Sequence, residues 1–102
     1  MFDFDRWAEW LQAQAVELSR PRIQCVFKDG RSVPQLASNP SYGLEVTNDR
    51  RLAYIRFWHK GLCDYEVCDA SNGANLANAF MLEAHDATIT LLFDRFWSAL
   101  SS

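Results

Sequence analysis

No apolar run in the sequence approaches the ~18 residues that a membrane-spanning helix requires, so no membrane partner is expected. The excess of one charge over the other is also small. Ten basic and thirteen acidic residues leave a net charge of -3, which argues against a general nucleic-acid binder. Three cysteines cannot form a complete disulfide set, so free thiols in a reducing cytoplasm are expected. The segment MFDFDRWAEWL is acidic and amphipathic, unlike a secretory signal.

Apolar and aromatic residues, in contrast, are plentiful. Of 102 residues, 49% are hydrophobic and 14% are aromatic, including four Trp and seven Phe. This is ample to bury a core at this length, and it excludes intrinsic disorder, which needs few aromatics and high net charge. We therefore expect one domain over residues 1–102.

Two segments have the periodicity of amphipathic helices. The first spans residues 3–19 and ends before Pro21, which cannot donate a helical hydrogen bond. Its apolar stripe is Phe4, Trp7, Leu11, Ala15 and Leu18. Asp86 is a good candidate for the N-cap of the last helix. The apolar stripe of that helix is Ile89, Leu92, Phe93, Phe96, Trp97 and Leu100.

Apolar and polar residues alternate between these helices, as in half-buried strands. Short strands are expected around residues 23–28 and 42–47, separated by a long irregular segment from Asp29 to Ser41. A third and a fourth strand follow at 51–58 and 62–69. Residues 75–83 are interpreted as a fifth strand, although their Ala and Met content makes a helix a real competitor.

The pattern of the third and fourth strands selects the length of their hairpin loop. A two-residue loop, Lys60-Gly61, pairs Phe57 with Asp64 and mixes carboxylates into an apolar face. A three-residue loop, 59–61, shifts the register by one and pairs Phe57 with Cys63. The side chains expected to face the core are then Ala53, Ile55, Phe57, Cys63, Tyr65 and Val67.

These elements predict an α+β fold. Its centre is an antiparallel β-meander of four to five strands, flanked by an N-terminal and a C-terminal helix packed on one face. An antiparallel sheet can leave its second face in water. The side chains expected on that second face are Leu52, Tyr54, Arg56, Trp58, Leu62, Asp64 and Glu66.

Candidates for catalysis or metal binding are few. Cys63 and Cys68 are five residues apart in one strand, so they point to opposite faces and cannot share a metal. Asp64 and Glu66 lie on one strand face and could serve acid–base chemistry. Arg56 is expected directly opposite Asp64, however, which favours a solvated cross-strand ion pair. We expect neither an enzyme nor a metal or cofactor.

The second face carries the residue types in which binding energy concentrates at protein interfaces. Tyr54, Arg56 and Trp58 project together and are flanked by Asp64 and Glu66. These five residues form the predicted partner-binding site. An alternative remains open, in which another element, such as the 29–41 segment, covers the two aromatic rings.

The helix segment FDRWAEWL precedes the strand RIQCVF and the hairpin LAYIRFWHKGLCDYEVCDASNG, and a final strand and helix follow. The most specific part is the hairpin, with an aromatic before a Gly-containing turn and Asp64, Tyr65 and Glu66 after it. In these parts and their order the chain resembles the TriTu family of small immunity proteins from bacterial polymorphic toxin systems. The resemblance implies a cytoplasmic bacterial protein that binds and neutralises a cognate toxin, without catalysis or cofactor.

Two other functions compete with this one. A small acidic adaptor or secretion chaperone would use the open sheet face or a helix to form a homodimer. A small hydrolase would use Asp64 and Glu66 as its acid and base. Light scattering tests the first alternative, because an adaptor or chaperone of this kind would be a dimer. Replacing Asp64 and Glu66 with Asn and Gln tests the second, because a hydrolase would lose its turnover.

Overall fold

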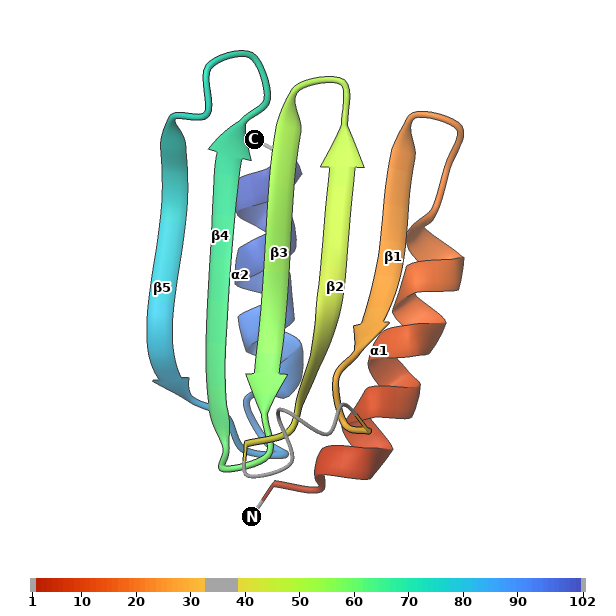
Figure 1. Ribbon diagram of the computed structural model, residues 1–102, viewed down its shortest axis with the longest axis vertical. Coiled ribbons are helices and arrows are strands. Elements are labelled where there is room, and N and C mark those ends of the chain that lie inside the picture. Colours follow the sequence, from red (N-terminus) through yellow and green to blue (C-terminus); the bar gives the residue numbers. More distant parts are fainter. Residues whose placement is uncertain (1, 33–38, 102) are drawn as a thin grey trace.

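The computed structural model describes residues 2–32 and 39–101, and it contains two helices and one five-stranded sheet (Figure 1). Part of the expected 29–41 segment, residues 33–38, lies outside the described residues. The elements follow the chain as α1 (Phe4–Leu18), β1 (Ile23–Asp29), β2 (Ser41–Asn48), β3 (Arg51–Trp58), β4 (Leu62–Asp69), β5 (Asn75–Glu83) and α2 (Ile89–Ser101).

The sheet is an antiparallel meander in the order β1-β2-β3-β4-β5, so each strand pairs with its neighbour in the sequence. The expected hairpin register is confirmed, with Phe57 opposite Cys63 and Arg56 opposite Asp64. Gly61 closes the three-residue loop with a φ of 84°, in the left-handed region that glycine adopts without strain. The α+β fold and the buried set of the central hairpin are therefore as the sequence predicts.

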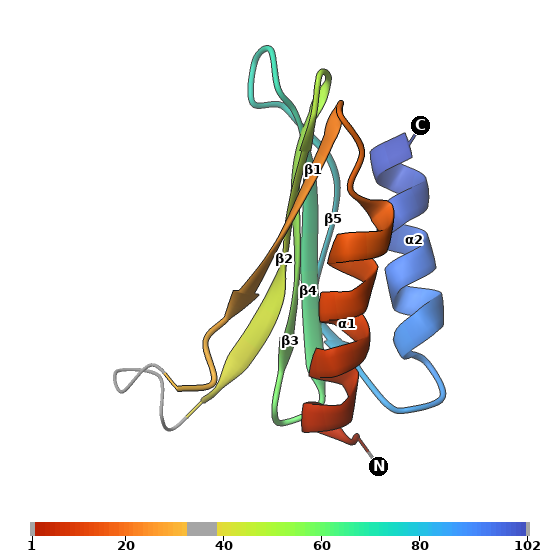
Figure 2. The same ribbon diagram turned by 90° about the vertical axis from the view of Figure 1, so that its right-hand side faces the viewer.

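Both helices lie on the same face of the sheet (Figure 2). Helix α1 packs on β1 and β2, and α2 packs on β3 and β4. The core between the two layers holds Ala53, Ile55 and Phe57 of β3, and Phe57 is only 1% exposed. Tyr42 on β2 is fully buried there, and its hydroxyl donates a 2.7 Å hydrogen bond to the Phe4 carbonyl.

Helix α1 begins as expected, but α2 does not. Asp3 is the N-cap of α1, and its carboxylate accepts from the Arg6 amide. Asp86 was expected to cap α2, which instead begins three residues later at Ile89. Its Oδ1 accepts the Asp3 amide at 2.8 Å and the Trp7 indole at 2.9 Å. These two donors occupy the Asp86 carboxylate, so it is not available to cap α2.

Residues 75–83 form a strand, and the competing helix is wrong. The strand is irregular, with register shifts between Cys63 and Tyr65 and between Val67 and Cys68 of the neighbouring strand. Met81 lies at the first irregularity with a φ of 56°, unusual for a residue with a side chain. No helix in the described part of the chain is long and apolar enough to cross a membrane.

Candidate functional site

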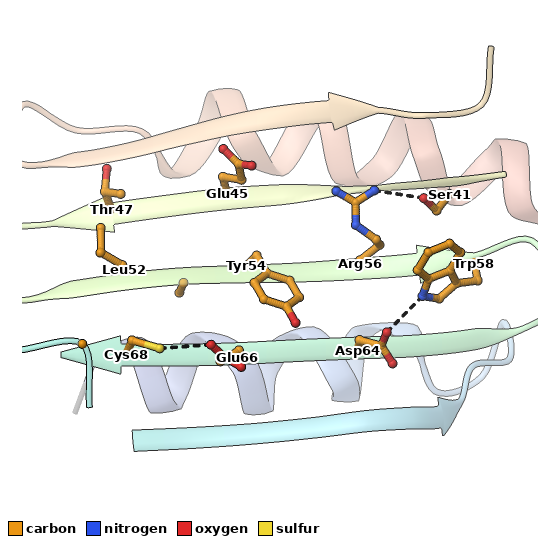
Figure 3. Close-up of a pocket in the computed structure, with 12 residues that line it drawn as sticks. Ser41, Glu45, Thr47, Leu52, Tyr54, Arg56, Trp58, Asp64, Glu66 and Cys68 are labelled. Carbon is orange, nitrogen blue, oxygen red and sulfur yellow. Dashed lines mark hydrogen bonds between the residues drawn. The ribbon is translucent and has the colours of Figure 1, made fainter. Parts of the chain in front are cut away.

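The face of the sheet opposite the helices carries a shallow hollow of about 820 Å³ (Figure 3). We call this face the open face, because within residues 2–32 and 39–101 no helix lies on it (Figure 2). The five predicted site residues all line the hollow, and each is partly exposed: Tyr54, Arg56, Trp58, Asp64 and Glu66. Strand parity alone brings them together, since they alternate with buried residues on β3 and β4.

Trp58 and Asp64 are held in place by a hydrogen-bond chain across three strands. The Trp58 indole donates to Asp64 Oδ2 at 3.2 Å. The amide of Met81 on β5 donates to Asp64 Oδ1 at 2.7 Å. Asp64 thus links Trp58 on β3 to the irregular edge strand β5. The positive φ of Met81 costs ~1–3 kcal/mol, and the hydrogen bond from the Met81 amide to Asp64 offsets part of this cost. Both carboxylate oxygens therefore already have a partner.

Arg56 does not form the expected ion pair with Asp64. Its guanidinium Nη1 instead donates to the hydroxyl of Ser41 at 2.9 Å, and it points away from β4 in Figure 3. The reason lies on β2, where Gly43 is directly opposite Arg56 and has no side chain to obstruct it. The cation lies over this gap and satisfies Ser41, which is fully buried.

Tyr54 lies near the middle of the open face and leans toward β4 (Figure 3). Burial raises the pKa of its hydroxyl, and the neighbouring Glu66 and Asp64 carboxylates raise it further. Its neighbours across the strands are Glu45 on β2 and Glu66 on β4. The ring leans toward the Glu66 strand (Figure 3), and its hydroxyl stays protonated at neutral pH.

The cysteines divide between the two faces, as predicted. Cys63 is buried in the core, and burial raises its pKa to about 12. Cys68 lines the hollow and donates to Glu66 Oε1 at 3.2 Å, a hydrogen bond that raises the pKa of the thiol. At neutral pH both groups are therefore thiols, which are poor nucleophiles. In residues 2–32 and 39–101, no group of three or more His, Cys, Asp or Glu side chains could hold a metal ion.

Sequence reasoning missed the contributions of the flanking strands. From β2, Ser41, Glu45 and Thr47 line the hollow, and Glu45 also forms a 3.9 Å ion pair with Lys28. The alternation that marks Tyr42, Leu44 and Val46 as buried could have placed these three on the open face.

From β5, Leu76 and Phe80 are 49% and 55% exposed. Because Asn78 pairs with Glu66, these two residues share the parity of the open face. The irregularity at Met81 reverses the parity of the strand, so that Leu82 faces the core. Because the parity changes within β5, the alternation of apolar and polar residues over 75–83 does not show which apolar residues face outward.

A protein-family model described as the immunity protein TriTu matches residues 5–99. This region contains the whole sheet with its open face and nearly all of both helices. No match to a curated protein was found, and no solved structure matches either.

Proposed function

Because the chain belongs to the TriTu family of immunity proteins, we propose that it binds a cognate bacterial toxin and neutralises it by protein–protein contact. The open face is the proposed contact surface. One observation carries this proposal: an aromatic and charged hollow lies on the sheet face that the helices leave uncovered. Large apolar and aromatic patches on small proteins are typical of interaction sites.

The proposed contact residues are Tyr54, Arg56, Trp58, Asp64 and Glu66. Tyr, Trp and Arg are the residues in which interface energy concentrates, especially near the centre of a patch. Leu52 at one end of the hollow is 48% exposed and extends its apolar area. The face thus combines an aromatic centre with a polar and charged surround, the usual composition of a protein interface.

The hydrogen bonds within the face favour tight binding. Ser41 holds Arg56, and Asp64 holds Trp58, before any partner arrives. Immobilising a flexible side chain on binding costs ~0.5–1.5 kcal/mol, so side chains that are already held lower this cost. Asp64 accepts hydrogen bonds from Trp58 and Met81, and Glu66 accepts one from Cys68. Because both carboxylates already have partners, they are better suited to protein contact than to acid–base catalysis.

The proposed complex forms in the cytoplasm. The three cysteines are free thiols, a state that a reducing compartment maintains. The net charge of -3 favours encounter with a basic toxin surface, because opposite charge speeds diffusional association.

Co-expression with the toxin encoded by the gene adjacent to this chain's own gene tests the proposal. We expect the wild-type chain to restore growth and the Arg56→Ala/Trp58→Ala double variant to fail. The matched control is Val16→Ala/Leu91→Ala, which changes exposed residues on the two helices. Soluble, folded levels of all three chains are measured in parallel by circular dichroism. A wild-type chain that fails to protect, or a folded face variant that protects fully, contradicts the proposal.

A further inference from the structure

A row of three side chains crosses the centre of the open face. Glu45 on β2 is directly opposite Tyr54 on β3, and Tyr54 is directly opposite Glu66 on β4. All three line the hollow: the Tyr54 ring leans toward the Glu66 strand, and Glu45 extends from the strand on the other side of β3 (Figure 3). Neighbouring strands are ~4.8 Å apart, so the backbones that carry Glu45 and Glu66 lie ~10 Å apart, one on each side of the strand that carries Tyr54.

We propose that this row receives a lysine or arginine side chain of the toxin, a site that rests on the toxin-binding function above. A cation over the face of a tyrosine ring is attracted by the ring's quadrupole, and flanking carboxylates add direct ion pairing. The apolar stem of such a side chain needs an apolar surface to lie on. The partly exposed side chains of Leu52 and Trp58, at the two ends of the hollow, provide one.

The charges that line the hollow support a cationic occupant. Glu45, Asp64 and Glu66 are three carboxylates, and Arg56 is the one guanidinium, so two negative charges remain uncompensated by the lining. Arg56 is directed to Ser41, away from β4. Among the described residues, no Lys or Arg lies within ion-pair distance of Glu66, whose Oε1 accepts the Cys68 thiol. Glu45 pairs only loosely with Lys28, at 3.9 Å between half-exposed side chains.

The test compares two double variants that remove the same charge. Glu45→Gln/Glu66→Gln neutralises the row, and Glu9→Gln/Glu17→Gln neutralises two exposed carboxylates on α1. Affinity for the toxin domain encoded by the adjacent gene is measured by calorimetry at low and high salt. We expect the row variant to lose about tenfold or more in affinity at low salt and to show a weaker salt dependence. We expect the helix variant to change affinity by less than about threefold.

The outcomes separate this site from the toxin-binding function. If the row variant binds like the helix variant while Trp58→Ala weakens binding, the cation site is wrong, but the open face is still the surface that binds the toxin. If Trp58→Ala also has no effect, the contact face itself is wrong. If light scattering shows a dimer that Arg56→Ala dissociates, the occupant is a second copy of this chain, and the toxin site is overturned.

A small probe tests the same site without the toxin. The tripeptide Gly-Arg-Gly, with both termini blocked, is titrated into isotope-labelled protein and followed by NMR. The control is the same peptide with citrulline in place of arginine, which has nearly the same shape but no charge. We expect the arginine peptide to shift the amide signals of Glu45, Tyr54 and Glu66 at least about threefold more than the citrulline peptide. Equal shifts from both peptides, or shifts confined to the helices, would overturn the inference.

Discussion

At the scale of single residues, the open face is organised by two side chains held in opposite directions. Arg56 is directed toward β2 by the Ser41 hydroxyl, and Trp58 is directed toward β4 by the Asp64 carboxylate. Tyr54 lies beside them on the same strand face. The Arg56–Ser41 contact was not predictable from strand register, because register places Arg56 opposite Asp64. The missing side chain of Gly43 decides between the two directions.

Truncation of the held side chains tests their contribution to binding. Trp58→Ala and Arg56→Ala are each expected to lower affinity for the toxin domain by ~1–3 kcal/mol, because each removes a partly buried, pre-positioned contact. Titration calorimetry measures the affinity, and Val16→Ala on α1 is the control. Both variants are expected to fold, since neither side chain belongs to the core. A collapse of the fold would show that the face is buried by something else.

The thiols report on the two faces through their reactivity. Burial raises the pKa of Cys63 to about 12, and the Glu66 hydrogen bond raises the pKa of Cys68. A raised pKa means less thiolate, so both react slowly with iodoacetamide at about pH 8. Glu66→Gln removes the carboxylate that opposes ionisation of Cys68, which lowers the pKa of that thiol. We expect mass spectrometry to show faster alkylation of Cys68 with Cys63 unchanged, and preferential alkylation of Cys63 would contradict the assignment.

At the scale of elements, the sheet depends on a close approach between β2 and β3. A Cβ added at Gly43 would lie 2.1 Å from the Ile55 carbonyl oxygen, a distance that no side chain can adopt. The glycine therefore sets the spacing of the two strands and opens the gap over which Arg56 lies. Gly43 therefore matters both for the packing of the sheet and for the arrangement of the open face.

Replacing this glycine is expected to destabilise the sheet. Gly43→Ala should lower the free energy of unfolding by ~1–3 kcal/mol or more, because the strands must separate to admit the methyl group. Gly73→Ala is the comparison, since Gly73 has a φ of 74° but open space around it. Its cost is backbone strain alone, ~1–2 kcal/mol. Urea unfolding compares the two, and a Gly43→Ala variant as stable as wild type would contradict the close approach.

A second tie between elements joins the start of α1 to the turn before α2. Asp86 accepts the Asp3 amide and the Trp7 indole, and these hydrogen bonds lower the pKa of the carboxyl below its ordinary 3.8. A lowered folded-state pKa stabilises the protein above the unfolded-state pKa, and this stabilisation is lost as pH falls through the folded-state value.

The pH dependence of unfolding tests this tie. At neutral pH, Asp86→Asn is expected to unfold at lower urea than wild type, because the amide is a weaker acceptor than the carboxylate. The difference should shrink as pH falls below the ordinary Asp pKa of ~3.9 and through the lowered folded-state pKa, where the wild-type carboxyl takes up its proton. A difference that stays constant between neutral and acid pH would show that Asp86 does not act through its charge.

At the scale of the whole molecule, two helices cover one face of the sheet, and no helix of the described residues lies on the other face (Figure 2). The sequence predicted this division because alternation on β3 and β4 allows only one register that keeps Asp64 out of the core. It could not predict the outward residues of β5, where the irregularity at Met81 reverses the parity. Nor could it predict the role of Asp86, because capping and tertiary hydrogen bonds compete for the same oxygen.

Mapping the surface that contacts the toxin domain tests most directly whether the open face binds the toxin. Cross-saturation NMR, with the toxin domain irradiated, reports which side chains of this protein touch it. We predict signal loss at the Trp58 indole and the Leu52 methyls, with none at the methyls of Val16 and Leu91 on the helices. Signal loss confined to Val16 and Leu91, with Trp58 and Leu52 unaffected, would show that the helices make the contact and that the open face does not.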